Sequence, residues 1–105
     1  MKNYKVFSMN KEVSPATQTQ IGSFTITSGI WLLIGFMDWN ASQDCMYLFG
    51  LNSRNIRANA ISGGGVNNCS IANITSETTT FQVYAYHAGS TVMTARCTIN
   101  AVKIG

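Results

Sequence analysis

The chain has 105 residues, a mass of 11.4 kDa and a formal net charge of +3 at pH 7. This length allows one compact domain and excludes a second. Charged residues make up only 10% of the chain, against about 25% in typical soluble domains. The seven basic residues form no cluster larger than two, which argues against nucleic-acid binding because phosphate recognition needs a basic stripe.

Uncharged hydrogen-bonding residues replace the usual charged coat. Asn, Ser, Thr and Gln account for 35 of the 105 positions. Asn, Ser and Thr are unfavourable inside helices, whereas Thr suits strands. Aromatic residues make up 10% of the chain and supply core-forming side chains, which argues against disorder. The composition therefore predicts an all-β fold with a neutral surface.

Targeting signals and cysteine usage both indicate a reduced, non-membrane protein. No apolar run approaches the ~18 residues that a membrane-spanning helix needs, and no apolar signal core follows Met1–Lys5. We therefore expect synthesis in the cytoplasm, without a signal peptide and without membrane insertion. The three cysteines, Cys45, Cys69 and Cys97, are odd in number and lack CxxC spacing. That pattern favours free thiols over a disulfide framework or a zinc site.

The first predicted strand covers residues 4–9, and a connector with the only proline, Pro15, follows it. Residues 19–27 then place apolar side chains at alternate positions, which is the period of a half-buried strand. Ser28-Gly29 is predicted to form the turn that ends this strand.

Two of the predicted strands, residues 30–39 and 45–51, are apolar on both alternating faces. In an antiparallel sandwich one face of a strand meets the opposite sheet. The second face must then be covered by a loop or by a partner subunit. Two such strands in so short a chain therefore favour an oligomer.

The second half of the chain continues the strand pattern. Further strands are predicted at residues 55–62, 69–74, 80–87 and 92–104, with Gly63-Gly64-Gly65 as a hairpin tip and 75–79 as a connection. Strand 80–87 alternates so that one face is core and the other presents Tyr84 and Tyr86. In the last strand the apolar parity changes near Val102, which predicts a bulge or burial on both faces.

About eight strands without helical periodicity predict an antiparallel two-sheet β-sandwich of jelly-roll type. Residues 1–18 would form an N-terminal strand and connector, and residues 19–105 the jelly-roll sandwich itself, in a single domain overall.

Catalytic chemistry has few residues to draw on: four acidic side chains in different segments and one histidine, His87, which we place at a solvent edge. No acidic pair has the context of a general acid and base, so we expect no enzyme activity, no catalytic residue and no cofactor. A small hydrolase that pairs His87 with a cysteine is kept as a minor alternative. Asp38, Asn40 and Asp44 could offer oxygens to calcium, but two carboxylates without a glycine-anchored loop favour a hydrogen-bonded turn, and no metal site is predicted.

Three stretches resemble a known class of protein: Ser28–Gly35, Thr80–Ser90 and Thr98–Ile104. They are a glycine-aromatic entry to an early strand, a penultimate strand that ends at a Gly-Ser turn, and an Ala-Val-Lys-Ile final strand. Together they resemble the trimeric jelly-roll heads of phage tail and receptor-binding proteins. Those heads are similar to the globular heads of the complement and tumour-necrosis-factor superfamily.

The resemblance implies a homotrimer whose threefold axis is lined by aromatic side chains, a role that Tyr47, Tyr84 and Tyr86 would match. It also implies a surface that binds a host carbohydrate or protein, and a place in the virion, at a tail fibre or tip, beside other tail or virion proteins. The long N-terminal shaft that such fibres usually carry is missing from this sequence. An excised head, a separate tip subunit and a capsid decoration protein therefore all stay open.

The leading hypothesis is a non-enzymatic viral receptor-binding or adhesion head that recognises a host surface glycan or protein through polar loops at 40–44, 62–68 and 87–91. Adaptable hydrogen bonding combined with aromatic contact is the chemistry of such recognition surfaces. The candidate ligand-binding residues are Trp39, Asn40, Asp44, Asn67, Asn68, His87 and Ser90. The alternative is a structural virion, decoration or assembly subunit that binds its own neighbours and no external ligand.

Overall fold

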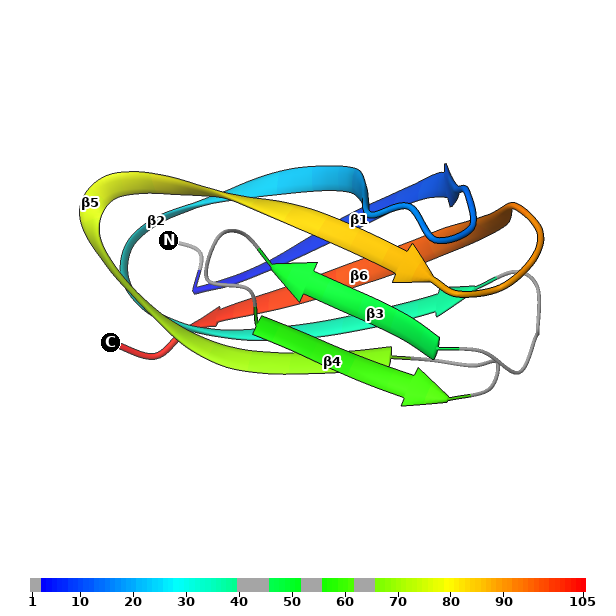
Figure 1. Cartoon of the computed structure of the whole chain (residues 1–105). Helices are drawn as coiled ribbons and strands as arrows, with labels where there is room; N and C mark the ends of the chain where they lie inside the picture. Colours follow the sequence, from blue (N-terminus) through cyan, green and yellow to red (C-terminus); the bar gives the residue numbers. More distant parts are fainter. Residues whose placement is uncertain (1–2, 40–45, 52–55, 62–65) are drawn as a thin grey trace.

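The computed structural model describes residues 3–39, 46–51, 56–61 and 66–105, and for residues 56–61, 66 and 68 it describes the backbone alone. This part of the chain contains strands and no helix. The strands are β1 (Tyr4–Val13), β2 (Thr19–Trp39), β3 (Met46–Leu51), β4 (Ile56–Ile61), β5 (Val66–His87) and β6 (Met93–Lys103). They pair antiparallel in one sheet with the order β1-β6-β2-β5-β3-β4 (Figure 1). The predicted all-β class and antiparallel pairing are confirmed.

Strands β2 and β5, with 21 and 22 residues, run alongside each other and curve round together at one end of the molecule (Figure 1). The pairing jumps from Thr27↔Thr78 to Gly29↔Ile74, so three residues of β5 lie opposite one of β2. Extra residues on one strand of a pair form a bulge, which bends the two strands without ending their pairing. Gly29 adopts a φ of +132°, a conformation that glycine tolerates best.

The prediction of a turn at Ser28-Gly29 and of a connection at 75–79 was therefore wrong. Each segment is the bend of a longer strand, which is why about eight predicted strands appear as six. The side chain of Trp31 helps to hold the bend, because its Nε1 donates a 2.9 Å hydrogen bond to the carbonyl oxygen of Thr27. Local sequence signals for a turn and for a bulge are the same, since both need glycine and small polar residues.

The bend folds the sheet over itself into two facing layers, which gives a sandwich-like molecule of 43 × 18 × 18 Å (Figure 1). The back layer consists of β1, β6, residues 29–39 of β2 and residues 66–74 of β5. The front layer consists of residues 19–27 of β2, residues 78–87 of β5, β3 and β4. Strand β1 belongs to the same sheet as the rest of the chain, because all ten of its residues pair with β6.

The core lies between the two layers. Phe7 of the back layer stacks on Phe24 of the front layer with 4.9 Å between ring centroids. Phe49 of the front layer faces Gly35 of the back layer so closely that a Cβ on Gly35 would lie 2.6 Å from Cζ of Phe49. Close dispersion contacts of this kind between the two layers stabilise the core.

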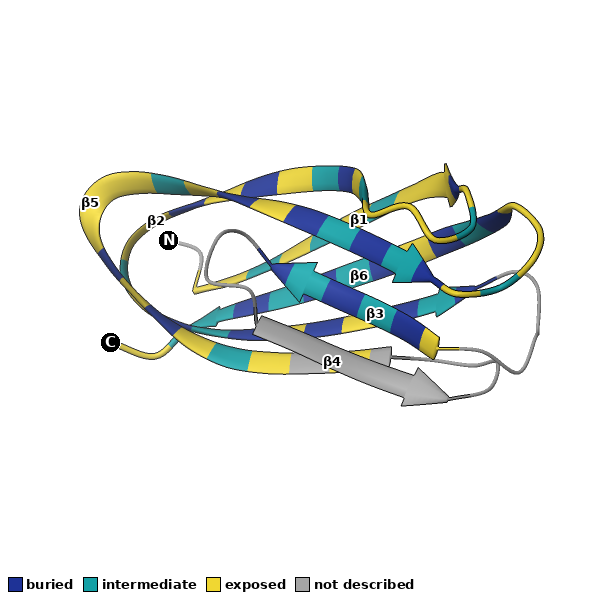
Figure 2. Ribbon diagram, viewed as in Figure 1, coloured by how far each residue is buried: buried dark blue, intermediate teal, exposed yellow. Residues whose placement is uncertain are grey.

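The predicted alternation of strands is confirmed by burial (Figure 2). In β5 the side chains of Phe81, Val83 and Ala85 are buried, as expected for the core face. In β6 the alternation continues without a register shift as far as Ala101. The predicted bulge is therefore absent, and Val102 lies half-buried on the outer face of the back layer.

Candidate functional site

The strands that flank the three predicted ligand loops end at the same end of the molecule, on the right in Figure 1. Tyr47, near the start of β3, pairs with His87 at the end of β5. Trp39, at the end of β2, pairs with Ala95 near the start of β6. The sheet therefore brings the borders of these loops together, although the chain separates them by up to about fifty residues.

The residues predicted to bind a ligand in these loops differ in where the structure places them. Asn40 and Asp44 lie outside the described residues. Strand β5 begins at Val66, so Asn67 and Asn68 belong to a strand and the predicted loop at 62–68 is too long. The side chain of Asn67 is exposed. Ser90 is exposed in the bend between β5 and β6, where a surface loop was predicted.

His87 and Trp39 are core residues, although His87 was expected at a solvent edge and Trp39 was a candidate for ligand binding at a strand end. His87 is fully buried and Trp39 is 7% exposed. The Trp39 ring lies 5.4 Å from His87 in an edge-on contact and 5.2 Å from Tyr47, measured between ring centroids. Among the described residues the buried Nε1 of Trp39 has no hydrogen-bond acceptor. Strand parity decides this outcome, because all three side chains point between the layers.

Both ring nitrogens of His87 are occupied by the backbone. The amide of Gly89 donates to Nδ1 at 3.1 Å, so Nδ1 is the acceptor and the ring proton sits on Nε2. Nε2 then donates to the carbonyl oxygen of Val13 at 2.9 Å. The carbonyl of His87 also accepts from the amide of Ala16, at 2.9 Å. The histidine thus ties the connector after β1 to the end of β5, and its ring has no nitrogen free to act as a base.

The two described cysteines differ in their surroundings. Burial raises the pKa of Cys97 from 9.0 to about 12, so this thiol stays protonated at neutral pH. Cys69 is exposed on β5, opposite Ile34 of β2. Within the residues that the structure covers, no three His, Cys, Asp or Glu side chains lie close enough to hold a metal ion.

Tyr47 is fully buried, so it does not reach a surface where a second subunit could touch it. Tyr84 and Tyr86 are half-buried on the outer face of the front layer. The hydroxyl of Tyr84 donates to Oε1 of Gln82 at 2.8 Å on that face. The three predicted interface tyrosines therefore do not form one surface.

An apolar face instead covers one half of the outer side of the back layer. It consists of Tyr4 and Val6 of β1, Val102 of β6, Leu32 and Ile34 of β2, and Ile71 of β5. Cross-strand pairing places Tyr4, Val102, Leu32 and Ile71 in one row. The next row is Val6, Asn100, Ile34 and Cys69, and its one amide side chain, Asn100, accepts a 2.7 Å hydrogen bond from the hydroxyl of Tyr4.

The exposed fraction is 64% for Ile71, 54% for Tyr4, 50% for Val6 and 42% for Ile34. Strands that face water normally alternate apolar and polar side chains. At this face β1 and β2 present apolar side chains outward, whereas β6 keeps the alternation as far as Asn100. Ile30 and Ile104 are exposed as well, beyond the first row. Nothing in the described part of the chain covers this face.

The sequence predicted one stripe of this face and missed the others. The outward side chains of strand 30–39 were expected to need a cover. Ile34 is one of them, and it is 42% exposed in the protomer. Tyr4, Val6 and Ile71 were missed because their contribution depends on which strands are neighbours in the sheet. The available signal was the shared parity of Tyr4 and Val6 in the first strand.

No helix in the described ranges is long and apolar enough to cross a membrane. The sequence matches no known protein family and no curated protein.

Proposed function

We propose that this chain is a non-enzymatic, self-assembling binding head: a jelly-roll protomer of a homotrimer that recognises a host surface carbohydrate or protein, as in phage or prophage receptor-binding proteins. The observation that carries the proposal is the apolar face, which a second copy of the chain would cover. The threefold symmetry and the viral setting come from the resemblance to trimeric heads.

The order of strands supports the jelly-roll assignment. When β2 and β5 are each divided at the bend, the chain has eight segments, numbered 1 to 8 in sequence. The back layer then has the order 1-8-3-6 and the front layer 2-7-4-5. Segments 1 and 8, 2 and 7, 3 and 6, and 4 and 5 are antiparallel neighbours, which is the arrangement of a long hairpin rolled into two four-stranded sheets. A jelly roll has the same order of neighbours, which supports the assignment.

The size of the apolar face supports a second copy as its occupant. Four strands about 4.8 Å apart, with two rows that span about four residues of each strand at 3.4 Å per residue, give a face of roughly 250 Å². A standard interface takes about 800 Å² from each partner, with an apolar core and a polar rim. The apolar face supplies such a core, and the Asn, Ser and Thr residues around it supply the rim. In such a contact the apolar face of one copy packs against the apolar face of another, so no charged partner is required.

The test is the oligomeric state of the protein with the apolar face altered. Ile34→Glu and Ile71→Glu each add a charge to an exposed position, so the protomer should still fold. Burying that charge between subunits is unfavourable, and we expect assembly to weaken at least about tenfold. Sedimentation equilibrium of the whole chain measures the effect.

Two control variants make the result specific. Ser23→Glu adds the same charge at an exposed position of the same strand but on the front layer, and it should leave assembly unchanged. Tyr84→Ala tests the axis that the sequence suggested, and it should also leave assembly unchanged. A protein that is monomeric at all concentrations, or whose assembly is sensitive to Tyr84→Ala and insensitive to Ile34→Glu, would overturn the proposal.

A structural virion or assembly subunit is the second candidate. The apolar face favours it equally, because self-association needs no external ligand. The two functions differ in whether the assembled protein binds host cells or their glycans. Assembly without any such binding would select the structural subunit.

A further inference from the structure

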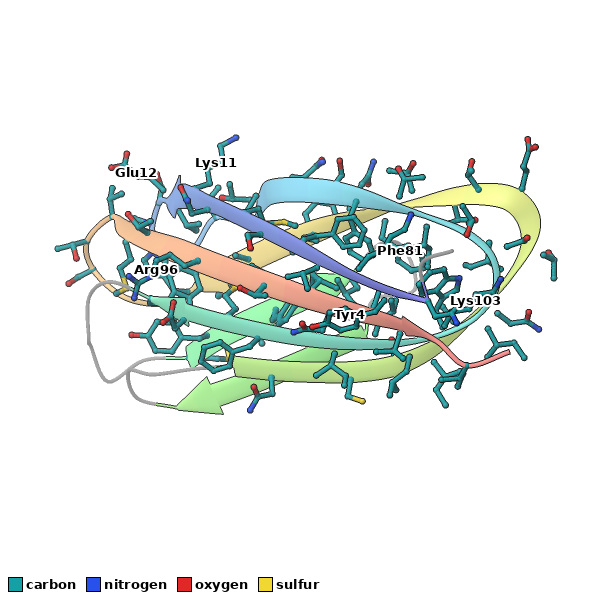
Figure 3. The ribbon with its side chains drawn as sticks, turned by 180° about the vertical axis from the view of Figure 1, so that it is seen from behind. Tyr4, Lys11, Glu12, Phe81, Arg96 and Lys103 are labelled. Atoms are coloured by element: carbon teal, nitrogen blue, oxygen red, sulfur yellow. The ribbon has the colours of Figure 1, made fainter. Side chains whose placement is uncertain are left out.

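The back layer carries a second feature beside the apolar face, at the opposite half of the same side. Phe36, Thr98 and Ser8 form the next cross-strand row, and Asp38, Arg96 and Asn10 the row after it. These side chains line a depression of about 370 Å³ on β2, β6 and β1. Figure 3 shows Arg96 toward one end of this layer and Tyr4, which belongs to the apolar face, toward the other.

An ion pair organises the polar side of the depression. Nε of Arg96 donates to Oδ1 of Asp38 at 3.0 Å, and the second guanidinium nitrogen donates to Oδ2 at 3.2 Å. This two-point contact fixes the orientation of both groups. The side chains are nevertheless 56% and 37% exposed, so a ligand can reach them. An exposed pair of this kind contributes little to stability, so folding alone gives little reason for its geometry.

The ion pair gives the site no net charge, so the site offers no net attraction to an anion or to a cation. Asp38 repels an anion and Arg96 repels a cation, and the pair is neutral as a whole. The carboxylate oxygens keep free lone pairs, and the guanidinium keeps N–H groups that Asp38 does not use. The hydrogen-bond acceptors of Asp38 therefore lie beside the donors of Arg96. This pair suits a ligand group that both donates and accepts hydrogen bonds. Adjacent hydroxyls of a sugar ring have that property.

Phe36 supplies the apolar side. Its ring is 44% exposed and lies one row from the ion pair. The face of an aromatic ring carries negative partial charge and attracts weakly positive C–H groups, such as those on one side of a sugar ring. Ser8, Asn10 and Thr98 add neutral hydrogen-bonding groups around the rim. The volume is at the lower end of the about 300 to 1,000 Å³ range of small-molecule sites, which suits one or two sugar rings.

We propose that the depression formed by Phe36, Asp38, Arg96 and their neighbours is a binding subsite for a neutral saccharide. This inference rests on the proposed binding function and moves the ligand from the strand-end loops to the outer side of the back layer. The subsite lies next to the apolar face, so assembly through that face would place it at the border of the subunit contact.

The experiment uses the whole chain and a defined set of sugars. Neutral oligosaccharides of glucose, galactose and N-acetylglucosamine are offered free in solution. Sialyllactose and a heparin oligosaccharide serve as charged probes. Saturation-transfer NMR detects binding, and calorimetry measures the Kd. We expect at least one neutral sugar to bind and the charged probes to bind at least about tenfold more weakly, because the site has no net positive charge to offset the cost of removing water from an anion.

Three variants locate the site. Phe36→Thr removes the ring from an exposed position. The double variant Asp38→Arg with Arg96→Asp keeps an ion pair but exchanges its donor and acceptor sides. Each should weaken neutral-sugar binding at least tenfold with an unchanged circular dichroism spectrum. Thr25→Ala, an exposed change on the front layer, is the control and should bind within about twofold of the original chain.

The outcomes separate this inference from the proposed function. An assembled protein that binds sugar equally well in the Phe36→Thr and charge-exchanged variants has its site elsewhere, which overturns the subsite and leaves the function standing. A monomeric protein that binds sugar at the depression supports the subsite and overturns the assembled head. An assembled protein that binds none of the neutral sugars overturns the subsite and leaves a protein ligand or a structural role.

Discussion

At the scale of single residues, His87 shows how position in the sheet overrides residue type. A lone histidine beside a glycine at a strand end was expected at a solvent edge. Its parity instead points the ring between the layers, where it is fully buried. Burial of a polar ring is tolerated only with its hydrogen bonds made, and the amide of Gly89 and the carbonyl of Val13 make them. The histidine is a structural link between two connections.

The cysteines give a residue-scale prediction because Cys69 is exposed and Cys97 is buried. In a Cys45→Ser background at pH 8, iodoacetamide should label Cys69 and leave Cys97 unlabelled until the protein is unfolded. The reason is that alkylation needs an accessible thiolate, and burial raises the pKa of Cys97 to about 12. Mass spectrometry of the labelled peptides measures this. Equal labelling of both thiols in the folded protein would contradict it.

The same raised pKa sets an alkaline limit to stability. Below pH 9 the thiol is protonated in both folded and unfolded chains, so Cys97 adds no pH dependence. Above pH 9.0 the unfolded chain ionises while the folded chain stays protonated up to about pH 12. The free energy of unfolding should therefore fall by about 1 kcal/mol per pH unit in this window. Urea denaturation at several pH values should show this slope, and Cys97→Ala should reduce it.

At the scale of elements, glycines decide where strands bend and where layers approach. Gly35→Ala should destabilise the fold by about 1 to 3 kcal/mol, because the new Cβ would lie 2.6 Å from Cζ of Phe49 and 3.0 Å from Cδ1 of Ile99. Gly50→Ala is the matched control, since among the described side chains its Cβ would meet only Cβ of Tyr84, at 3.7 Å. Urea denaturation compares the two. Equal stabilities would show that the layers separate more easily than the structure indicates.

The element scale also explains why the number of strands was overestimated. Ser28-Gly29 and residues 75–79 each carry the small polar residues of a turn. They lie opposite each other in the sheet, so the β2–β5 ladder resumes after the bulge. A turn would have ended both strands, whereas a shared bulge bends both. Only the pairing of two segments distant in sequence distinguishes the two cases.

At the scale of the whole molecule, assembly through the apolar face makes thermal stability depend on concentration. Dissociation accompanies unfolding of an oligomer, so mass action raises the midpoint as protein concentration rises. For a trimer of this chain length we expect about 4 °C for each tenfold increase. Calorimetry over a hundredfold concentration range measures it. The Ile34→Glu variant should show a lower midpoint that does not vary, and an equally constant midpoint in the original chain would count against assembly.

Local sequence determined much of this protein. Composition predicted an all-β chain, and period-two patterns located the strands and their core faces, such as Phe81, Val83 and Ala85. The excess of apolar residues on strand 30–39 also predicted a face in need of a cover. These properties follow from neighbours along the chain, because strand periodicity is a local signal.

Tertiary structure alone decided which outward side chains share a surface. Tyr4, Ile34 and Ile71 are far apart in sequence, and they meet only because β1, β6, β2 and β5 are neighbours in the back layer. The same strand order places Asp38 beside Arg96. The register of β3 and β5 places the side chains of Tyr47 and His87 in the core. Sheet order and register depend on non-local pairing, in which a shift of one residue exchanges the inner and outer faces of a strand. No local pattern contains that information.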